Sequence, residues 1–293
     1  MSTYKPTRPL TWLITGCSSG LGLELTRTIQ DHGDLVIATS RQPSRIPVLV
    51  DEIQNHGGEW HSLDVDDPTA AASLIEMLET NGHHIDVLVN NAGVIVFGIL
   101  EQLADKDLRD QMETLYFGPQ RLIRAVLPGM RARQFGVIVN ISSGAALDGN
   151  GSMGAYAAAK AALDASTRVL AKEVAPFNIR PLTVWLGTLN TNIMNVSPIV
   201  QGPLLEDYRG SGAEQLMEAI RSRKFTGNGD KKKAAKAIYE VVVGEGAGAG
   251  HEAERFLPMG RDMISRVELV RDQYGHALEV FGEVCGNIQL EHE

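Results

Sequence analysis

Short apolar runs alternate with longer amphipathic stretches over most of this 293-residue chain. Continuously apolar runs such as VLVN (87–90) are typical of parallel strands covered on both faces of a sheet. Their alternation with helical stretches is the signature of βαβ units. We therefore expect an α/β fold in which helices cover both faces of a parallel sheet. The pattern predicts six strands before residue 187, within LTWLIT (10–15), DLVIATS (34–40), EWHSLDV (59–65), IDVLVNN (85–91), GVIVNIS (136–142) and IRPLTVWLG (179–187).

The regular alternation fails between Thr188 and about Gly229. Long irregular stretches inside compact domains are usually functional lids or disordered insertions. Beyond this stretch, Asp230 is placed to cap a helix, because aspartate is a preferred residue before the first helical turn. A short strand over RFLPMG (255–260) and a helix from about Arg261 to Phe281 are expected to follow.

No repeat and no composition shift separates a second folding unit. We expect a single domain over residues 1–293, with a lid at about 188–229 and a C-terminal helical extension at about 261–293.

Composition and charge narrow the classes of partner. The chain has a net charge of −9 and no basic block longer than Lys231–Lys233, which argues against binding to a nucleic-acid backbone. It has no apolar span long enough to cross a bilayer and no signal-peptide cleavage pattern, so we expect no membrane partner and a cytoplasmic, reducing location. Its two cysteines, Cys17 and Cys285, share no metal-ligand spacing with the histidines, so neither a disulfide framework nor a zinc site is expected.

A tyrosine and a lysine stand four residues apart in GAYAAAKAAL (154–163). Neither glycine nor proline interrupts the alanine-rich stretch from Ala155 to Leu170, which predicts a helix. On a helix, Tyr156 and Lys160 share one face, with Cβ atoms about 5–6 Å apart. A phenol beside an ammonium group loses its proton more readily. Taken alone, the pair also fits a tyrosine at the edge of a core and a lysine that reaches water.

A glycine-rich turn follows the first apolar run. TGCSSGLG (15–22) places glycines at 16, 20 and 22 directly before a helical pattern. Such glycines let the backbone approach a pyrophosphate closely, and the helix N-terminus supplies amide donors. The spacing differs from the common G-x-G-x-x-G, and its strand–turn–helix setting is the context that supports the motif.

Four features in order resemble the short-chain dehydrogenase/reductase family: TGCSSGLG, NNAG (90–93), Tyr156-x-x-x-Lys160, and Ser143, which precedes Tyr156 at the same spacing as the active-site serine of that family. The resemblance runs along nearly the whole chain. It implies a Rossmann-like, doubly wound parallel sheet of about seven strands and a bound nicotinamide dinucleotide. The implied reaction is hydride transfer between the nicotinamide ring and a carbonyl or secondary alcohol.

The resemblance also assigns roles to residues. Tyr156 would be the general acid for reduction, with Lys160 and the oxidised nicotinamide lowering its phenol pKa from about 10. Lys160 would also hold the ribose hydroxyls, and Ser143 would donate a hydrogen bond to the substrate oxygen. Residues matched to cofactor contacts are Gly16, Ser18, Ser19, Gly20, Leu21, Gly22, Ser40, Arg41, Asp64, Asn91, Ala92, Gly93, Tyr156, Lys160 and Thr191.

The residue after the second strand indicates which nicotinamide cofactor is used. An acidic residue there would bind the ribose 2′-hydroxyl, whereas an arginine accommodates a 2′-phosphate. Ser40 and Arg41 therefore predict NADP(H) over NAD(H), although Arg41 also fits an exposed arginine in a polar loop. Asp64 matches an adenine contact and could otherwise cap a turn, while Thr191 matches a contact to the nicotinamide carboxamide.

Two positions depart from the family pattern. Leu115, in METLYFGP, replaces an asparagine that in family members helps to shape a helix kink and a water-linked proton path to the lysine. Leu186 replaces the proline that usually precedes a glycine after the sixth strand. Both substitutions add apolar surface near the expected site, and structural drift without functional meaning explains them equally well.

These features favour an NADPH-dependent reductase, or alcohol dehydrogenase, for a largely hydrophobic carbonyl or alcohol. The alternatives are an NADP(H)-binding protein without redox turnover and a redox-neutral isomerase or cyclase. The resemblance also implies a homodimer or homotetramer. The substrate prediction rests on apolar residues in the expected lid, which could equally pack against the core: Leu189, Ile193, Met194, Val196, Ile199, Val200, Leu204, Leu205, Tyr208, Leu216, Met217 and Phe225.

Overall fold

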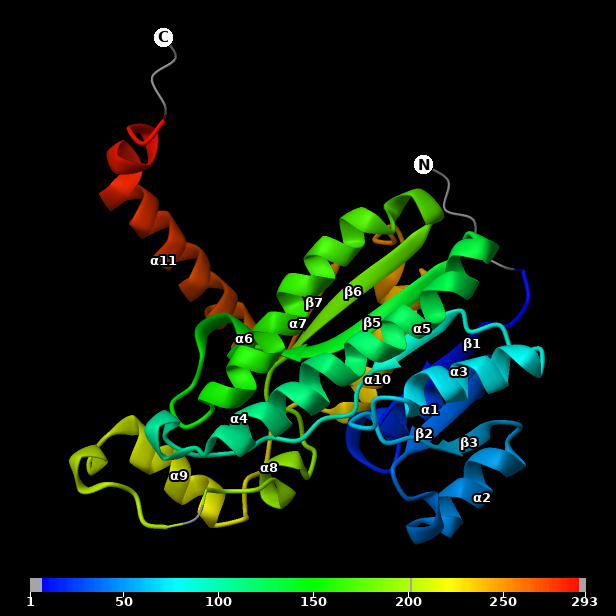
Figure 1. Cartoon of the computed structure of the whole chain (residues 1–293), viewed down its shortest axis with the longest axis horizontal. Coiled ribbons are helices and arrows are strands. Elements are labelled where there is room, and N and C mark those ends of the chain that lie inside the picture. Colours follow the sequence, from blue (N-terminus) through cyan, green and yellow to red (C-terminus); the bar gives the residue numbers. More distant parts are fainter. Residues whose placement is uncertain (1–6, 201, 290–293) are drawn as a thin grey trace.

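Seven parallel strands form one sheet in a computed structural model that describes residues 7–200 and 202–289 (Figure 1). The strand order is β3-β2-β1-β4-β5-β6-β7, and every neighbouring pair is parallel. The strands are β1 (Thr11–Ile14), β2 (Leu35–Ser40), β3 (Glu59–Ser62), β4 (Val87–Asn90), β5 (Gly136–Ser143), β6 (Ile179–Leu186) and β7 (Phe256–Met259). The predicted Rossmann-like sheet, with six strands before residue 187, is confirmed.

The chain reverses its direction of progress across the sheet between β1 and β4, which are neighbours although β2 and β3 intervene in the sequence. In open α/β sheets, ligands bind in the crevice beyond the carboxyl ends of the strands at such a switch point. The topology therefore places a binding crevice after residues 14 and 90, where the glycine-rich turn and NNAG begin.

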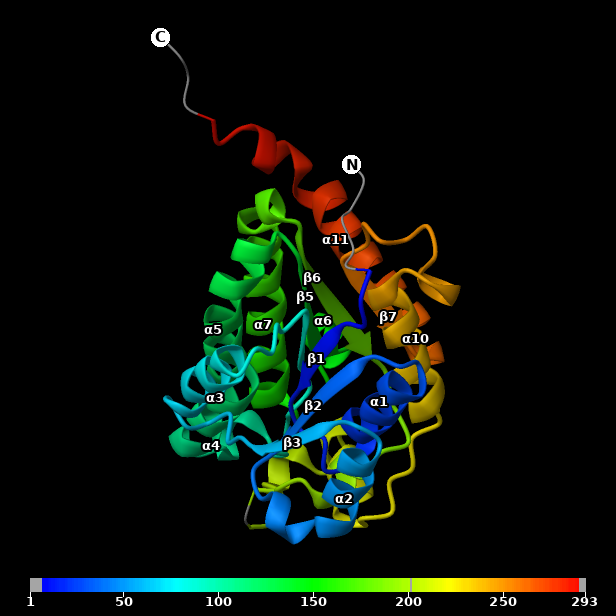
Figure 2. The same ribbon diagram turned by 90° about the vertical axis from the view of Figure 1, so that its right-hand side faces the viewer.

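Helices pack on both faces of the sheet, with α1 and α10 on one face and α3, α5 and α7 on the other (Figure 2). In β1, Trp12 and Ile14 pack in the first core layer, whereas Leu13 packs in the second. The helices are α1 (Gly20–Asp31), α2 (Pro47–Asn55), α3 (Ala70–Thr80), α4 (Asp105–Met112), α5 (Gly118–Arg133), α6 (Ala145–Asp148), α7 (Gly154–Glu173), α8 (Ile193–Val196), α9 (Gly212–Arg221), α10 (Lys231–Val243) and α11 (Arg261–Gly286).

The expected lid is more regular than its sequence suggested. It contains α8 and the ten-residue helix α9, whereas residue 201 lies outside the described residues. Ser211 caps α9, because its Oγ accepts a hydrogen bond from the Glu214 amide. Met217 and Ile220 of α9 are buried, so packing of one helical face stabilises the segment.

The C-terminal part agrees with the predicted elements. Asp230 caps α10 by accepting hydrogen bonds from the amides of Lys232 and Lys233. The final helix extends to Gly286, beyond its expected end at Phe281, while residues 290–293 of the predicted extension lie outside the described part of the chain, as do residues 1–6. Within the described ranges, no helix combines the length and apolar character needed to cross a bilayer.

Candidate active site

A cavity of about 1230 Å³ lies at the switch point of the sheet. Its size exceeds the usual range of about 300–1,000 Å³ for small-molecule pockets, which suits a large ligand and a second, smaller one. Gly22 is the one candidate site residue that does not line it. The candidates that do are Gly16, Ser18, Ser19, Gly20, Leu21, Ser40, Arg41, Asp64, Asn91, Ala92, Gly93, Ser143, Tyr156, Lys160 and Thr191.

Gly22 has a packing role instead. A Cβ atom at this position would lie 2.5 Å from the carbonyl oxygen of Gly16 and 2.5 Å from Nδ2 of Asn91. Glycine therefore lets α1 pack against the turn and the loop after β4. Gly20 serves differently, since its φ of +61° lies in the region that disfavours other residues.

Thr15 joins the glycine-rich turn to the NNAG loop. Its Oγ1 accepts hydrogen bonds from the amides of Asn91 and Ala92, each at 3.0 Å. Nδ2 of Asn91 donates to the Thr15 carbonyl over 2.8 Å. Thr15 was not among the predicted site residues. Its place at the junction of strand and turn was visible in the sequence, but its partners in the loop after β4 were not.

The residues that follow β2 and β3 line one end of the cavity. The Ser40 hydroxyl accepts a hydrogen bond of 3.0 Å from Trp60 Nε1, so it is already engaged within the protein. Arg41 is exposed, and its guanidinium forms no ion pair with any residue that the structure describes. Asp64 Oδ1 accepts a hydrogen bond of 3.2 Å from the Asp66 amide. Asp64 therefore caps a turn, which is the alternative role that the sequence allowed. Both Arg41 and Asp64 line the cavity.

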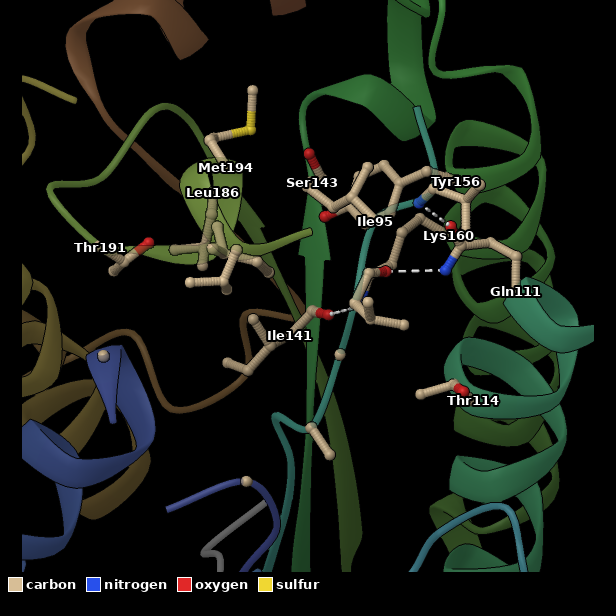
Figure 3. A pocket seen from close by; sticks show the side chains of 18 of the residues that line it. Ile95, Gln111, Thr114, Ile141, Ser143, Tyr156, Lys160, Leu186, Thr191 and Met194 are labelled. Atoms are coloured by element: carbon tan, nitrogen blue, oxygen red, sulfur yellow. Dashed lines mark hydrogen bonds between the residues drawn. The ribbon is translucent and has the colours of Figure 1, made fainter. Parts of the chain in front are cut away.

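Ser143, Tyr156 and Lys160 meet at the opposite end of the cavity (Figure 3). Ser143 ends β5, whereas Tyr156 and Lys160 lie on the inner face of α7 and are both buried. Lys160 Nζ donates a hydrogen bond of 2.6 Å to the Ile141 carbonyl and lies 5.9 Å from the centre of the Tyr156 ring. The structure thus brings together three side chains that belong to two separate elements of the sequence.

Burial dominates the proton affinities of this group. Burial raises the pKa of the Tyr156 phenol above its ordinary value of 10.0, although the Ser143 hydroxyl opposes the shift. Burial lowers the pKa of Lys160 from 10.5 to about 8. Both shifts favour the uncharged forms, as expected for groups removed from water. Cys17, in the glycine-rich turn, likewise stays protonated at neutral pH because burial raises its thiol pKa to about 11.

Asp164 lies one helical turn beyond Lys160 and is also buried. Its Oδ2 accepts a hydrogen bond of 2.7 Å from Trp185 Nε1 of β6. Burial raises the pKa of this carboxyl group, and its charge in turn favours the ammonium form of Lys160. Sequence reasoning missed Asp164, although an acidic residue four positions after a buried lysine on one helical face was a usable signal.

Arg266 of α11 also lines the cavity, beside the end of β5. Its Nε donates to Asp148 Oδ2 over 2.7 Å, and its Nη2 pairs with the other oxygen of the same carboxylate. The Arg266 charge favours ionisation of the Tyr156 phenol. No local sequence signal indicated Arg266, because its partner lies in α6, far earlier in the chain.

The helix kink expected from asparagine forms here with leucine. A π-helical turn over Glu113–Phe117 separates α4 from α5, and Leu115 in this turn is fully buried. Leu115 packs in an apolar cluster with Tyr156, Ile95 and Phe97 among others. The Leu115 side chain therefore supports this turn by packing rather than by hydrogen bonding.

Gln111, one turn before Leu115, was missed from sequence. Its side chain is fully buried, and its Oε1 accepts a hydrogen bond of 2.7 Å from the Val96 amide. Its Nε2 donates to the Val94 carbonyl, also over 2.7 Å (Figure 3). Gln111 thus fixes the loop that continues from NNAG along the cavity wall.

The second departure, Leu186-Gly187, forms a close junction between three elements. The Leu186 carbonyl accepts a hydrogen bond of 2.9 Å from the Gly144 amide, and the Gly187 amide donates to the Met259 carbonyl over 2.8 Å. Leu186 also lines the cavity. The loop therefore ties the end of β6 to β7 and to the residue that follows Ser143.

The lid contributes an apolar wall, but only half of its predicted apolar residues line the cavity. Others belong to the protein interior; Met217, for example, is 1% exposed. The lid residues that do line the cavity are Leu189, Ile193, Met194, Val196, Leu216 and Phe225. The apolar residues of the lid are therefore divided between the cavity wall and other positions, and the prediction of a hydrophobic substrate rests on those in the wall.

The sequence profile of the short chain dehydrogenase family matches residues 11–198, which include the glycine-rich turn, NNAG, Ser143, Tyr156 and Lys160. The chain belongs to the short-chain dehydrogenase family. It is 41% identical to the oxidoreductase claN of Passalora fulva over 189 residues, which cover 64% of this chain and 86% of that protein.

Two solved structures extend the similarity over the fold. A short-chain dehydrogenase from Streptomyces avermitilis covers 97% of this chain and all of its own, with 32% identity and a TM-score of 0.85. The closed form of serine dehydrogenase complexed with NADP+ covers 85% of this chain and 94% of its own, with 26% identity and a TM-score of 0.70.

Members of this family bind nicotinamide dinucleotides, and the cavity wall fits such a group. Ser19 precedes α1, but its hydroxyl does not cap the helix, so the first-turn amides remain available to a pyrophosphate. Gly20 faces Thr191, with 3.6 Å between the Thr191 methyl group and the position that a Cβ would take. The chain would hold the dinucleotide between this turn, Arg41 and Lys160.

Proposed function

We propose that this short-chain dehydrogenase is an NADPH-dependent reductase of hydrophobic ketones or aldehydes, which also oxidises the corresponding alcohols. The observation that carries the proposal is the meeting of Ser143, Tyr156 and Lys160 at one end of a cavity whose other end presents Arg41. A bound nicotinamide would supply the hydride.

Tyr156 would donate the proton to the substrate oxygen. Because burial raises its pKa, the phenol stays protonated at neutral pH, the form that a general acid for reduction requires. Ser143 would hold the same oxygen through its hydroxyl group. The Lys160 charge would stabilise the phenolate left after proton transfer, and Asp164 would help to keep Lys160 charged.

The preference for NADP(H) rests on Arg41. Its guanidinium is exposed, lines the cavity and has no ion-pair partner among the described residues. An arginine after the second strand suits a 2′-phosphate, whereas no acidic residue occupies that position to bind a 2′-hydroxyl. The serine dehydrogenase structure with NADP+ is consistent with this preference.

The apolar wall of the cavity supports a hydrophobic substrate. Beyond the six lid residues named above, Ile95 and Met153 also line the cavity. An apolar pocket with a few polar groups is typical of sites that bind hydrophobic molecules and orient one functional group. Here Ser143 and Tyr156 would orient the carbonyl or hydroxyl group of the substrate.

The test is NADPH consumption with a panel of hydrophobic ketones by the parent protein and by Tyr156→Phe. We expect the variant to lose about 10²–10⁴-fold in kcat, the usual contribution of a positioned general acid. NADPH binding, followed by nucleotide fluorescence, should persist. Tyr239→Phe is the matched control, because Tyr239 is a buried tyrosine that does not line the cavity.

Equal turnover by Tyr156→Phe and the parent would refute the assignment of the acid. Binding of NADPH by the parent without turnover of any carbonyl would favour a binding protein, and product formation without NADPH consumption would favour an isomerase or cyclase.

A further inference from the structure

Helix α11 carries a continuous apolar stripe at Val270, Tyr274, Ala277, Phe281 and Val284, and Ile288, two residues beyond the end of the helix at Gly286, continues the same spacing. We call these six residues the α11 seam. The spacing between these residues alternates between four and three. That alternation is the heptad pattern of helices that pack along one another, and it keeps the side chains on one face. The first turn continues the same pattern through Met263 and Val267.

The seam has no partner within the described chain. The start of α11 packs against α6 and β7, and Met263 is buried there, but every residue from 271 to 289 is exposed. Figures 1 and 2 both show α11 projecting away from the sheet and its helices. On the seam, Tyr274 is 70% exposed, Phe281 58% and Ile288 77%. Large apolar side chains gathered on one exposed face mark an interaction site.

Between positions 268 and 288, the charged residues of α11 lie away from the seam. At about 100° per residue, the four acidic residues between positions 268 and 288 all fall on the face opposite the stripe: Glu268, Asp272, Glu279 and Glu283. The single basic residue in this stretch, Arg271, lies at the edge and pairs with Asp272 over 2.9 Å. A helix that lies on an anionic membrane surface needs lysine and arginine on its polar face, so this acidic helix does not suit one.

We propose that the α11 seam packs antiparallel against the α11 seam of a second copy of this chain. The half of α11 before residue 273 contains Arg261, Arg266 and Arg271 alongside three acidic residues, whereas the half after it has Glu279 and Glu283 and no lysine or arginine. The first half carries no net formal charge, because its three arginines match its three acidic residues, so an antiparallel pair places each acidic half beside a neutral half of its partner. A parallel pair would place the two acidic halves together.

The heptad positions define the register of the pair. Tyr274 of one copy faces Val284 of the other, and Ala277 faces Phe281. Aromatic side chains can bury about 150–250 Å² each, so Tyr274 and Phe281, together with the aliphatic residues of the seam, would supply a large part of the roughly 800 Å² per partner of a standard interface. The interface uses no residue of the cavity wall, so it is independent of the proposed reaction.

Sedimentation velocity of the full chain and of Phe281→Glu tests the pairing. We expect the variant to lose one level of assembly, from tetramer to dimer or from dimer to monomer, with self-association weakened about 30-fold or more, as for loss of a buried aromatic anchor. Ile264→Glu is the matched control, because it adds the same charge to an apolar residue of α11 that is 65% exposed and off the seam. NADPH binding by both variants would show that they are folded.

Cysteine cross-linking tests the direction of the pair. The two test proteins carry Tyr274→Cys or Val284→Cys in a Cys285→Ser background. A short bismaleimide should cross-link them into a mixed dimer when the two proteins are combined, and should not cross-link either protein alone. Cross-linking of Tyr274→Cys protein by itself would indicate a parallel pair and overturn the antiparallel arrangement. Equal assembly of the parent and Phe281→Glu would overturn the interface. Binding of the parent, but not of Phe281→Glu, to vesicles that contain phosphatidylserine would also overturn it.

Discussion

Lys160 is an ammonium group held inside the protein, next to the phenol that it is expected to assist. Burial opposes its charge, whereas the neighbouring Asp164 supports it. The balance leaves the lysine with a pKa of about 8, so the charge persists at neutral pH but at a cost to stability. Residues with strongly shifted pKa values cluster at functional sites, where stability is given up for chemistry.

That cost can be measured through its pH dependence. Between about pH 8 and pH 10.5, unfolded Lys160 binds more protons than folded Lys160, so the stability of the parent rises with pH in this window. A Lys160→Met variant lacks this gain. We expect its stability relative to the parent to fall by as much as about 3 kcal/mol between pH 7 and pH 10.5. Urea unfolding of both proteins at several pH values measures the difference.

The control for this prediction is Lys172→Met, which removes an exposed lysine from the same helix. Its stability relative to the parent should change little with pH. If both variants follow the same pH profile, the proton of Lys160 is not coupled to folding.

At the scale of elements, the π-helical turn over Glu113–Phe117 shows one geometry reached by different side chains. Family members are expected to use asparagine at position 115, whereas this chain places a fully buried leucine there. A buried leucine gains free energy by filling apolar space, and an amide in the same space requires hydrogen-bond partners. The kink therefore depends here on the packing between α4, α5 and α7.

Leu115→Asn tests whether the missing asparagine limits turnover. Because the amide would enter an apolar cluster, we expect a loss of stability of about 2 kcal/mol or more and no increase in kcat. Leu115→Met, which nearly conserves volume, should cost less than about 1.5 kcal/mol. Thermal unfolding and NADPH consumption report the two quantities. A faster Leu115→Asn enzyme of unchanged stability would show that the asparagine relay is the limiting part.

At the scale of the whole molecule, the cavity connects the two halves of the sheet. Arg41 and Asp64 follow β2 and β3, whereas Ser143, Tyr156 and Lys160 belong to β5 and α7. A dinucleotide that contacts both ends would stabilise the folded protein as a unit, by about 2.7 kcal/mol at a concentration 100-fold above its Kd.

We therefore expect NADP+ to raise the Tm more than the same concentration of NAD+. Arg41→Ala should reduce or abolish this difference, because it removes the proposed partner of the 2′-phosphate. Arg45→Ala is the control, since Arg45 is a nearby arginine that does not line the cavity. An unchanged NADP+ preference in Arg41→Ala would place recognition of the 2′-phosphate elsewhere.

The sequence predicted the sheet and most of the site because both depend on local patterns. Apolar runs marked each strand. The glycine-rich motif lies within a single turn, and Tyr156 and Lys160 lie on a single helical face, so both could be recognised from local spacing. Helix α9 was missed, although Ser211 and Glu214 carry a capping signal, because its surroundings contain prolines and glycines.

What the sequence by itself determined about this protein is therefore the order of its strands and of most of its helices, together with its candidate catalytic residues. Only the tertiary structure decided that Leu115 supports a kink, that Gln111 and Thr15 hold the cavity loops, and that Arg266 and Asp164 adjust the charges beside Tyr156 and Lys160. The physical reason is that burial and long-range partners set these roles. Both arise from packing between segments as far apart as Asp148 and Arg266, which no local pattern records.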